Sequence, residues 1–138
     1  MLDPENSSHT RQSLYARLGG YDGIGRFVHE LMPRLRQDPK LAVYWKGKSL
    51  DSKRRGDKLL TDFLCAAFGG PVEYFGPDMK TAHEGLGITE EEWNLTLTHI
   101  AASLDAVGVA ARDKSEFMEC AAGLKPEIVE FPAPAGSR

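Results

Sequence analysis

Apolar residues in this chain recur at the spacing of one face of an α-helix. Between about residues 22 and 36 they fall at i, i+3, i+4, i+7, i+8 and i+11, which places them on a single stripe. The residues of this stripe are Ile24, Phe27, Val28, Leu31, Met32 and Leu35. The same period recurs at about 52–68 and in the stretch that starts at Thr89. Because no stretch alternates convincingly in the manner of a strand, the pattern predicts an all-α fold.

Pairs of glycines separate the predicted helices. Gly19-Gly20 follows a short helix expected at 13–18, and Gly69-Gly70 ends the helix expected at about 52–68. Helices commonly end at glycine because glycine adopts the left-handed conformation at little cost. A doubled glycine also lets the chain turn sharply, so we expect abrupt turns between consecutive helices at both places.

Caps and helix breakers place the last two helices. Thr89 and Glu92 have the spacing of a capping box, which opens a helix that stops at Gly108. The final helix is expected to start near Asp113, and Pro126 should bend or interrupt it because proline lacks the amide hydrogen that a helix interior needs. These two helices follow a midsection that is mostly loop.

The organisation is that of one globular domain. A chain of 138 residues can bury a core without metal or disulfide crosslinks, and its 41% hydrophobic and 27% charged residues are ordinary for such a domain. We expect residues 13–130 to form this domain. Residues 1–12, rich in polar and charged types, should be a flexible extension, and residues 131–138, which contain a Pro-Ala-Pro-Ala-Gly-Ser run, should be a disordered tail.

Charge and composition exclude several classes of protein. The net charge of −3 argues against a dedicated nucleic-acid binder, which usually carries a basic surplus. No apolar run is long enough to cross a bilayer, and the first ten residues lack the apolar core of a secretion signal. Cys65 and Cys120 share no metal-ligand spacing, so a reduced, cytoplasmic setting is expected.

The strongest candidate for chemistry is a short helical segment that starts after Gly76-Pro77 and stops at Gly85. It carries His83, and an imidazole held against an apolar cavity can ligate a metal ion or a haem iron. The apolar neighbours of this histidine are Met79, Ala82, Leu86 and Ile88. A lone histidine in such a place is more often a packed core residue, so the segment by itself leaves both interpretations open.

Three stretches of the chain, taken in order, resemble the group I truncated haemoglobins. They are residues 14–20, residues 63–71 and residues 79–89, and the match as a whole covers about Ser13 to Glu130. Both glycine pairs and a Met-Lys-x-x-His run are present in these stretches, which makes the resemblance specific.

This resemblance implies a two-over-two helical sandwich around haem b, in which His83 is the proximal iron ligand. The other ring nitrogen of a ligating histidine usually donates to an oxygen, and the carbonyl of Met79, one turn earlier, is the expected acceptor. The basic stretch 46–58 is either a solvated face or a partner for the haem propionates. The residues expected to contact the haem are Met32, Tyr44, Trp45, Arg55, Leu60, Phe63, Leu64, Met79, Lys80, Ala82, His83, Leu86, Ile88, Trp93 and Thr96.

The distal side departs from the family pattern. Group I members commonly carry a Phe-Tyr pair in the second helix, whose tyrosine hydrogen-bonds oxygen, and the aligned positions here are Leu31 and Met32. The common distal polar positions of the third helix fall on Gly56 and Leu60. The distal pocket is therefore expected to be apolar. The candidates for a replacement donor are Thr96, ranked first because it lies on a core-facing stripe, then Tyr44, Trp45 and Lys58.

A sixth iron ligand is a further alternative. Lys58, or less readily Lys53, could bind the iron if burial lowered its pKa, and the thioether of Met32 could approach it as in cytochromes. We favour the ordinary roles of a solvated lysine and a packed methionine.

The function expected from the resemblance is reversible binding of a diatomic gas, O2, CO or NO. The protein should be a cytoplasmic monomer or weak dimer that binds neither nucleic acid nor membrane. Nitric oxide dioxygenase activity would need an external reductase, and the missing distal tyrosine argues against it. Two alternatives remain: a six-coordinate haem protein for electron transfer or for redox or gas sensing, and a haem-free helical interaction module.

Overall fold

The structure is helical over the part of the chain that it describes. The computed structural model describes residues 12–132, so the predicted flexible extension and tail lie outside the described residues except for Gln12, Phe131 and Pro132. Within residues 12–132 the β-type pairing is limited to an isolated bridge between Thr89 and Phe131. The helices are α2 (Leu14–Arg17), α3 (Gly20–Gln37), α4 (Leu50–Ala67), α5 (Met79–His83), α6 (Glu90–Ala106), α7 (Ala111–Ala122) and α8 (Lys125–Ile128), with a 3-10 turn, η1, at Ala42–Trp45.

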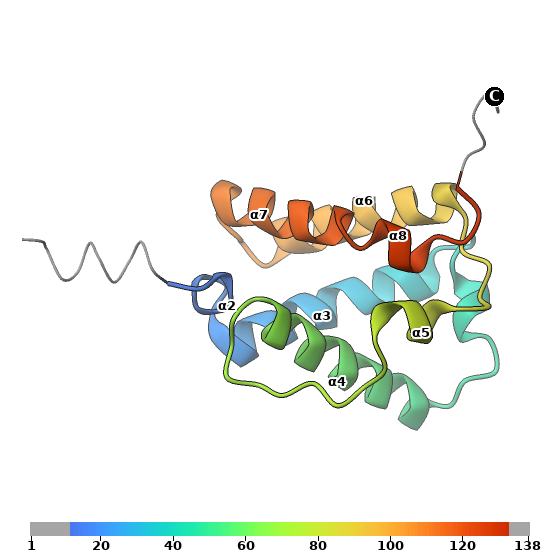
Figure 1. Ribbon diagram of the computed structural model, residues 1–138, viewed down its shortest axis with the longest axis horizontal. Helices are drawn as coiled ribbons and strands as arrows, with labels where there is room; N and C mark the ends of the chain where they lie inside the picture. The colour runs from blue at the N-terminus through green and yellow to red at the C-terminus, as the bar shows by residue number, and fades with distance from the viewer. Residues whose placement is uncertain (1–11, 133–138) are drawn as a thin grey trace, which may run out of the picture.

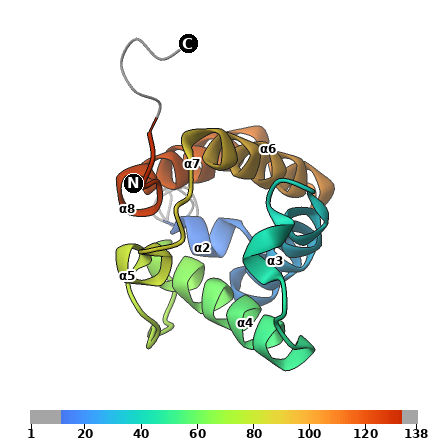
Figure 2. The same ribbon diagram turned by 90° about the vertical axis from the view of Figure 1, so that its right-hand side faces the viewer.

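Four long helices form two layers (Figure 1). Helices α3 and α4 pack together in one layer, and α6 and α7 pack together in the other. The short helices α5 and α8 contact each other and close one side of the space between the layers (Figure 2). This is the two-over-two arrangement that the resemblance implies, and the predicted all-α fold class is confirmed. Between residues 12 and 132, none of these helices combines the length and the apolar character that crossing a membrane requires.

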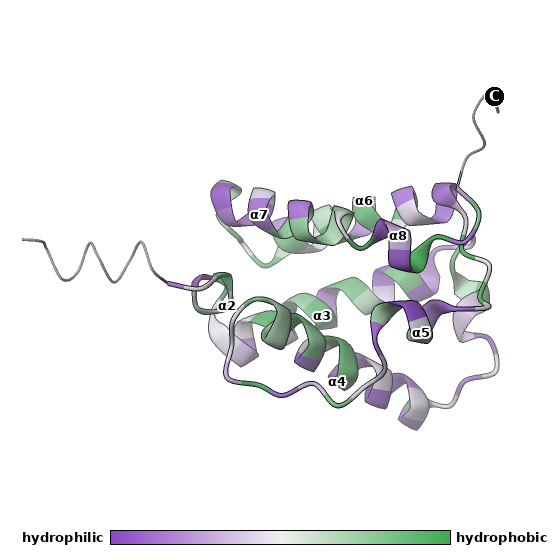
Figure 3. Ribbon diagram, viewed as in Figure 1, coloured by the Kyte–Doolittle hydropathy of each residue, from purple (hydrophilic) through white to green (hydrophobic). Residues whose placement is uncertain are grey.

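The core lies between the layers and is centred on α3. All six apolar residues of the predicted stripe on this helix are buried, which confirms its helical period. Phe117 of α7 packs against Phe27 and Phe68, with ring centroids 4.8 and 4.9 Å away. In Figure 3 hydrophobic residues run along much of α3 and α6, whereas α5 is mostly hydrophilic. Helix α5 buries none of its own residues and so contributes little to this core.

The capping box and the proline break fall where the sequence places them. Thr89 Oγ1 accepts from the amide of Glu92 at 3.1 Å, and Glu92 Oε1 accepts from the amide of Thr89 at 3.0 Å. Helix α7 stops at Ala122, and Pro126 lies in the first turn of the separate helix α8. The predicted interruption of the last helix is therefore confirmed.

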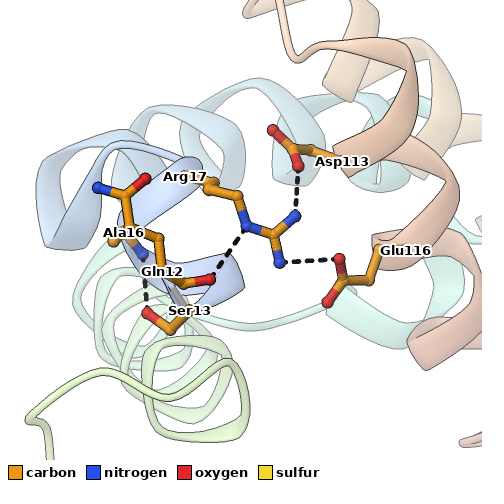
Figure 4. Close-up of polar contacts among 6 residues, drawn as sticks. All are labelled: Gln12, Ser13, Ala16, Arg17, Asp113 and Glu116. Carbon is orange, nitrogen blue, oxygen red and sulfur yellow. Dashed lines mark hydrogen bonds and ion pairs between the residues drawn. The ribbon is translucent and has the colours of Figure 1, made fainter. Parts of the chain in front are cut away.

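The start of α7 differs from the prediction. The helix begins at Ala111, two residues before Asp113, and the carboxylates of Asp113 and Glu116 in this helix bind Arg17 of α2 (Figure 4). Arg17 Nη1 donates to Asp113 Oδ1 at 2.6 Å and Nη2 donates to Glu116 Oε1 at 2.8 Å. Its Nε also donates to the carbonyl of Gln12 at 3.3 Å. These ion pairs tie the first helix of the fold to α7.

The first glycine pair lets α2 and α3 approach each other closely. Gly19 and Gly20 have φ angles of +98° and +69°, a region that favours glycine. Gly23, one turn into α3, lies so near α2 that a Cβ built on it would be 2.0 Å from the carbonyl oxygen of Leu18. Gly69, in the second pair, also has a positive φ of +92°. The sharp turns expected at both pairs are present.

We expect Gly23→Ala to lower the free energy of unfolding by about 1–3 kcal/mol, because the new methyl group must push α2 away from α3. Gly25→Ala is the matched control, since it lies in the same helix and a Cβ there meets nothing within 4 Å. That control should raise the free energy of unfolding by up to about 1 kcal/mol, because alanine favours a helix over glycine. Urea unfolding followed by circular dichroism measures both. Equal effects of the same sign would contradict the close contact.

Candidate functional site

A cavity of about 460 Å³ lies between the layers, within the size range of cofactor and ligand sites. Side chains from α3, η1, α4, α5, α6, α7 and α8 line it, and most of them are apolar. The predicted haem contacts that line it are Met32, Tyr44, Trp45, Leu60, Phe63, Leu64, Met79, Ala82, His83, Leu86, Ile88, Trp93 and Thr96. Arg55 and Lys80 do not line the cavity. Arg55 is exposed and instead pairs with Asp51 on its own helix.

His83 stands at the end of α5 and faces this cavity. Asp78 caps the start of the helix, where its Oδ1 accepts from the amide of Thr81 at 2.7 Å. His83 Nδ1 lies 2.8 Å from the carbonyl oxygen of Met79, the acceptor that the sequence suggested. Because a carbonyl oxygen only accepts, Nδ1 must carry the hydrogen. In the neutral ring, the lone pair is therefore on Nε2, which is the arrangement of a metal-ligating histidine.

No other described histidine has this position. His29 is exposed on α3, and His99 Nε2 lies 2.7 Å from Asp38 Oδ2, away from the cavity lining. His9 lies outside the described residues. Over residues 12–132 there is also no group of three His, Cys, Asp or Glu side chains placed to hold a metal ion. A lone imidazole in an apolar cavity therefore suits a metal that brings its other ligands with it, as the iron of a porphyrin does.

Apolar side chains occupy the part of α3 that the resemblance aligns with the Phe-Tyr pair of the group I truncated haemoglobins. Leu31 and Met32 are 4% and 7% exposed, and both line the cavity. The two hydroxyl groups that the sequence suggested as replacement donors, those of Thr96 and Tyr44, already donate hydrogen bonds within the protein. Thr96 Oγ1 donates to the carbonyl of Glu92 at 2.9 Å, and Tyr44 Oη donates to Glu92 Oε1 at 2.6 Å. Burial, with this bond to Glu92, raises the pKa of Tyr44 to about 12.

The two lysines considered as iron ligands differ in position. Lys58 is outside the cavity lining, and its Nζ binds Asp62 Oδ2 at 2.8 Å on the same helix. The hydrogen bond to Asp62 raises the pKa of Lys58, whereas iron ligation needs a lowered pKa. Lys53 does line the cavity. The structure therefore favours the solvated role for Lys58.

Arg36 is a cavity residue that the sequence reasoning missed. Its guanidinium pairs with Asp57, donates to the carbonyl of Lys53 at 3.3 Å and lies 6.0 Å from the ring centroid of Trp45. Its Nε is buried and has no hydrogen-bond partner among the described residues. The available signal was its spacing, since Arg36 follows Met32 by one helical turn and so shares its face of α3.

Comparisons with known proteins identify the family and the fold of the chain. A family model described as bacterial-like globin matches residues 13–130. The group 1 truncated haemoglobin of Mycolicibacterium paratuberculosis is 34% identical over 116 residues, which cover 84% of this chain and 83% of that protein. The group 1 truncated haemoglobin of Chlamydomonas moewusii is 30% identical over 127 residues, covering 91% of this chain and 72% of that protein. The Fe(III) form of the truncated haemoglobin from Tetrahymena pyriformis superposes with a TM-score of 0.77 at 24% identity, covering 86% of this chain and 98% of that one, a likeness of fold.

We expect Tyr44→Phe to lower the free energy of unfolding by about 1.5 kcal/mol, because it removes a partly buried hydrogen bond to a charged group. Tyr21→Phe is the control, since it removes a similar phenol–carboxylate bond, to Asp62 at 2.9 Å, on the exposed surface. The control should have less than half the effect. Urea unfolding at pH 7 measures both, and equal losses would contradict the larger contribution expected of the Tyr44–Glu92 bond.

Proposed function

Because the chain belongs to the bacterial-like globin family, as a group I truncated haemoglobin, we propose that His83 holds the iron of a haem b and that the protein reversibly binds a diatomic gas. The family implies haem and gas binding. The assignment of His83 rests on the protonated Nδ1 at the Met79 carbonyl, which leaves Nε2 as the ligand atom on the cavity side of α5.

The residues present suit a haem. An apolar lining takes the faces and edges of the porphyrin, and burial of that surface supplies most of its affinity. Arg36, Lys48 and Lys53 put positive charge on the same lining, which suits the two carboxylates of the macrocycle. Arg36 in particular offers a buried donor that no described protein group satisfies. A haem-free interaction module would have no need of a cavity with one oriented imidazole.

The side chains around the cavity have different roles in the proposed site. A haem held in this cavity would supply the iron that takes up a diatomic gas. The bond to Met79 fixes the ring plane and tautomer of His83. Leu31, Met32 and Leu60 line the cavity with apolar groups, which disfavour water there.

This composition gives the proposed site a weak hold on O2. A hydrogen bond to a charged or strongly polarised group contributes about 1.5–3 kcal/mol, and Leu31 and Met32 offer none. The hydrogens of Thr96 and Tyr44 are committed to Glu92. O2 should therefore leave roughly tenfold to a hundredfold faster than from a site with a tyrosine donor. The binding of CO depends less on such a donor, so the affinity for CO should differ less from that of other family members.

We expect His83→Ala to lose the haem or to bind it with an altered spectrum, because the cavity then offers the iron no imidazole. Added free imidazole should restore the proximal ligand and with it the wild-type spectrum. His29→Ala is the matched control and should behave as wild type, since His29 is exposed on α3. Optical spectra of the ferric, ferrous and carbonmonoxy forms provide the measurement. Wild-type spectra from His83→Ala in all three forms would refute the assignment.

We expect Met32→Tyr to slow the release of O2 by roughly tenfold to a hundredfold, because the phenol supplies the missing donor. Met32→Phe is the control, since it fills nearly the same volume without a hydroxyl. Stopped-flow measurement of O2 dissociation from the reduced proteins distinguishes them. Equal rates for the two variants would mean that position 32 does not face the gas-binding side of the cavity.

A further inference from the structure

The chain returns to the turn after His83 once α8 has ended, and it does so through Glu130. The amide of Gly85 donates to Glu130 Oε2 at 2.9 Å, and the amide of Gly87 donates to Oε1 at 2.6 Å. One carboxylate thus binds two main-chain amides of the same turn with its two oxygens. These hydrogen bonds lower the pKa of Glu130, so its charged form is the one that fits the turn.

Main-chain bonds reinforce this contact on the far side of the turn. The amides of Glu130 and Phe131 donate to the carbonyl of Ile88 at 2.9 and 3.2 Å. The amide of Glu90 in turn donates to the carbonyl of Phe131 at 3.2 Å. Phe131, the first residue of the predicted tail, is therefore bonded to the start of α6. The turn is held from both sides by a segment more than forty residues away.

The two glycines shape the turn so that its amides meet the carboxylate. Gly85 and Gly87 have φ angles of +85° and +72°, the region that side chains other than glycine rarely adopt. A Cβ on Gly87 would lie 3.3 Å from the ring of Phe131, so that residue packs directly on the glycine. The Gly85–Gly87 turn therefore contacts both the Glu130 carboxylate and the Phe131 ring.

Helix α5 depends on its ends for its position. It has five residues, buries none of them, and a helix of that length is unstable on its own. Asp78 fixes its first turn. At the other end, the amide of Leu86 donates to the carbonyl of His83 at 3.2 Å, which connects the histidine to the turn that Glu130 holds.

We propose that Glu130 is a positioning residue that fixes the end of α5 and thereby sets the strength of the bond between His83 and the haem iron. The proposal rests on the proposed function, because it assumes that His83 is the proximal ligand. Glu130 is not itself a lining residue of the cavity; it acts through the Gly85–Gly87 turn.

The test compares Glu130→Gln with Glu127→Gln, both loaded with haem. Glutamine keeps the shape of Glu130 but replaces one acceptor oxygen by a donor, so one amide of the turn loses its partner. Glu127 is the control because it is an exposed carboxylate on α8, three residues away. The first readout is the rate of haem transfer to excess apomyoglobin, which should rise about tenfold in Glu130→Gln and stay at the wild-type rate in Glu127→Gln.

The second readout is specific for the proximal bond. NO weakens the iron bond opposite to it, so a loosely held histidine dissociates and leaves a five-coordinate nitrosyl haem with a shifted Soret band. Glu130→Gln should show a larger five-coordinate share than wild type, and Glu130→Asp, whose shorter side chain cannot reach both amides, should lie between them.

Two results would overturn the proposal. One is a Glu130→Gln protein that matches wild type in haem transfer and nitrosyl spectrum. The other is faster haem transfer with an unchanged nitrosyl spectrum, which would show a general loosening of the fold and no effect on the iron bond. Failure of the underlying function is recognised separately, because His83→Ala would then keep the wild-type spectra.

Discussion

The hydrogen bond between His83 Nδ1 and the Met79 carbonyl is the interaction on which the rest of the site depends. It is made within one turn of a five-residue helix that buries nothing of its own. The bond decides which ring nitrogen carries the hydrogen, and so leaves Nε2 with the lone pair that a metal needs. Because the helix cannot hold this geometry alone, the protein secures its two ends through Asp78 and Glu130.

The cavity in front of that imidazole follows from how a short chain makes two layers. Gly23 lets α3 begin in contact with α2, and the Arg17–Asp113 ion pair fastens α2 to α7. The aromatic contacts of Phe117 fill the space at that end of the sandwich. Phe117 and the two rings that it contacts also line the cavity, together with Tyr44 and Glu92, which are bonded to each other.

Local pattern predicted much of this molecule because much of it is locally determined. The α3 stripe, the Thr89–Glu92 capping box and the Met79 acceptor each depend on spacings of three or four residues, which a sequence displays directly. Contacts between distant segments were not predicted. Asp113, near which the last helix was expected to start, lies inside that helix and binds Arg17, and the sequence gave no sign that Glu130 reaches the turn after His83. The distal side was predicted only in part. The apolar positions could be identified from the sequence, but the hydrogen bonds of the Thr96 and Tyr44 hydroxyl groups to Glu92 could not.

The basic residues show the same limit at the site itself. The sequence suggested Arg55, from a run of positive charge, but a run does not say which side of a helix faces a cavity, and Arg55 points to Asp51. Arg36 lines the cavity because it shares a face of α3 with Met32.

The most direct test of the central claim is resonance Raman spectroscopy of the reduced, haem-loaded protein with and without ¹⁵N-labelled histidine. An iron–ligand stretching band that shifts on labelling is the predicted result, and His83 is the histidine between residues 12 and 132 that lines the cavity. An iron–ligand band that is insensitive to the label would contradict the account.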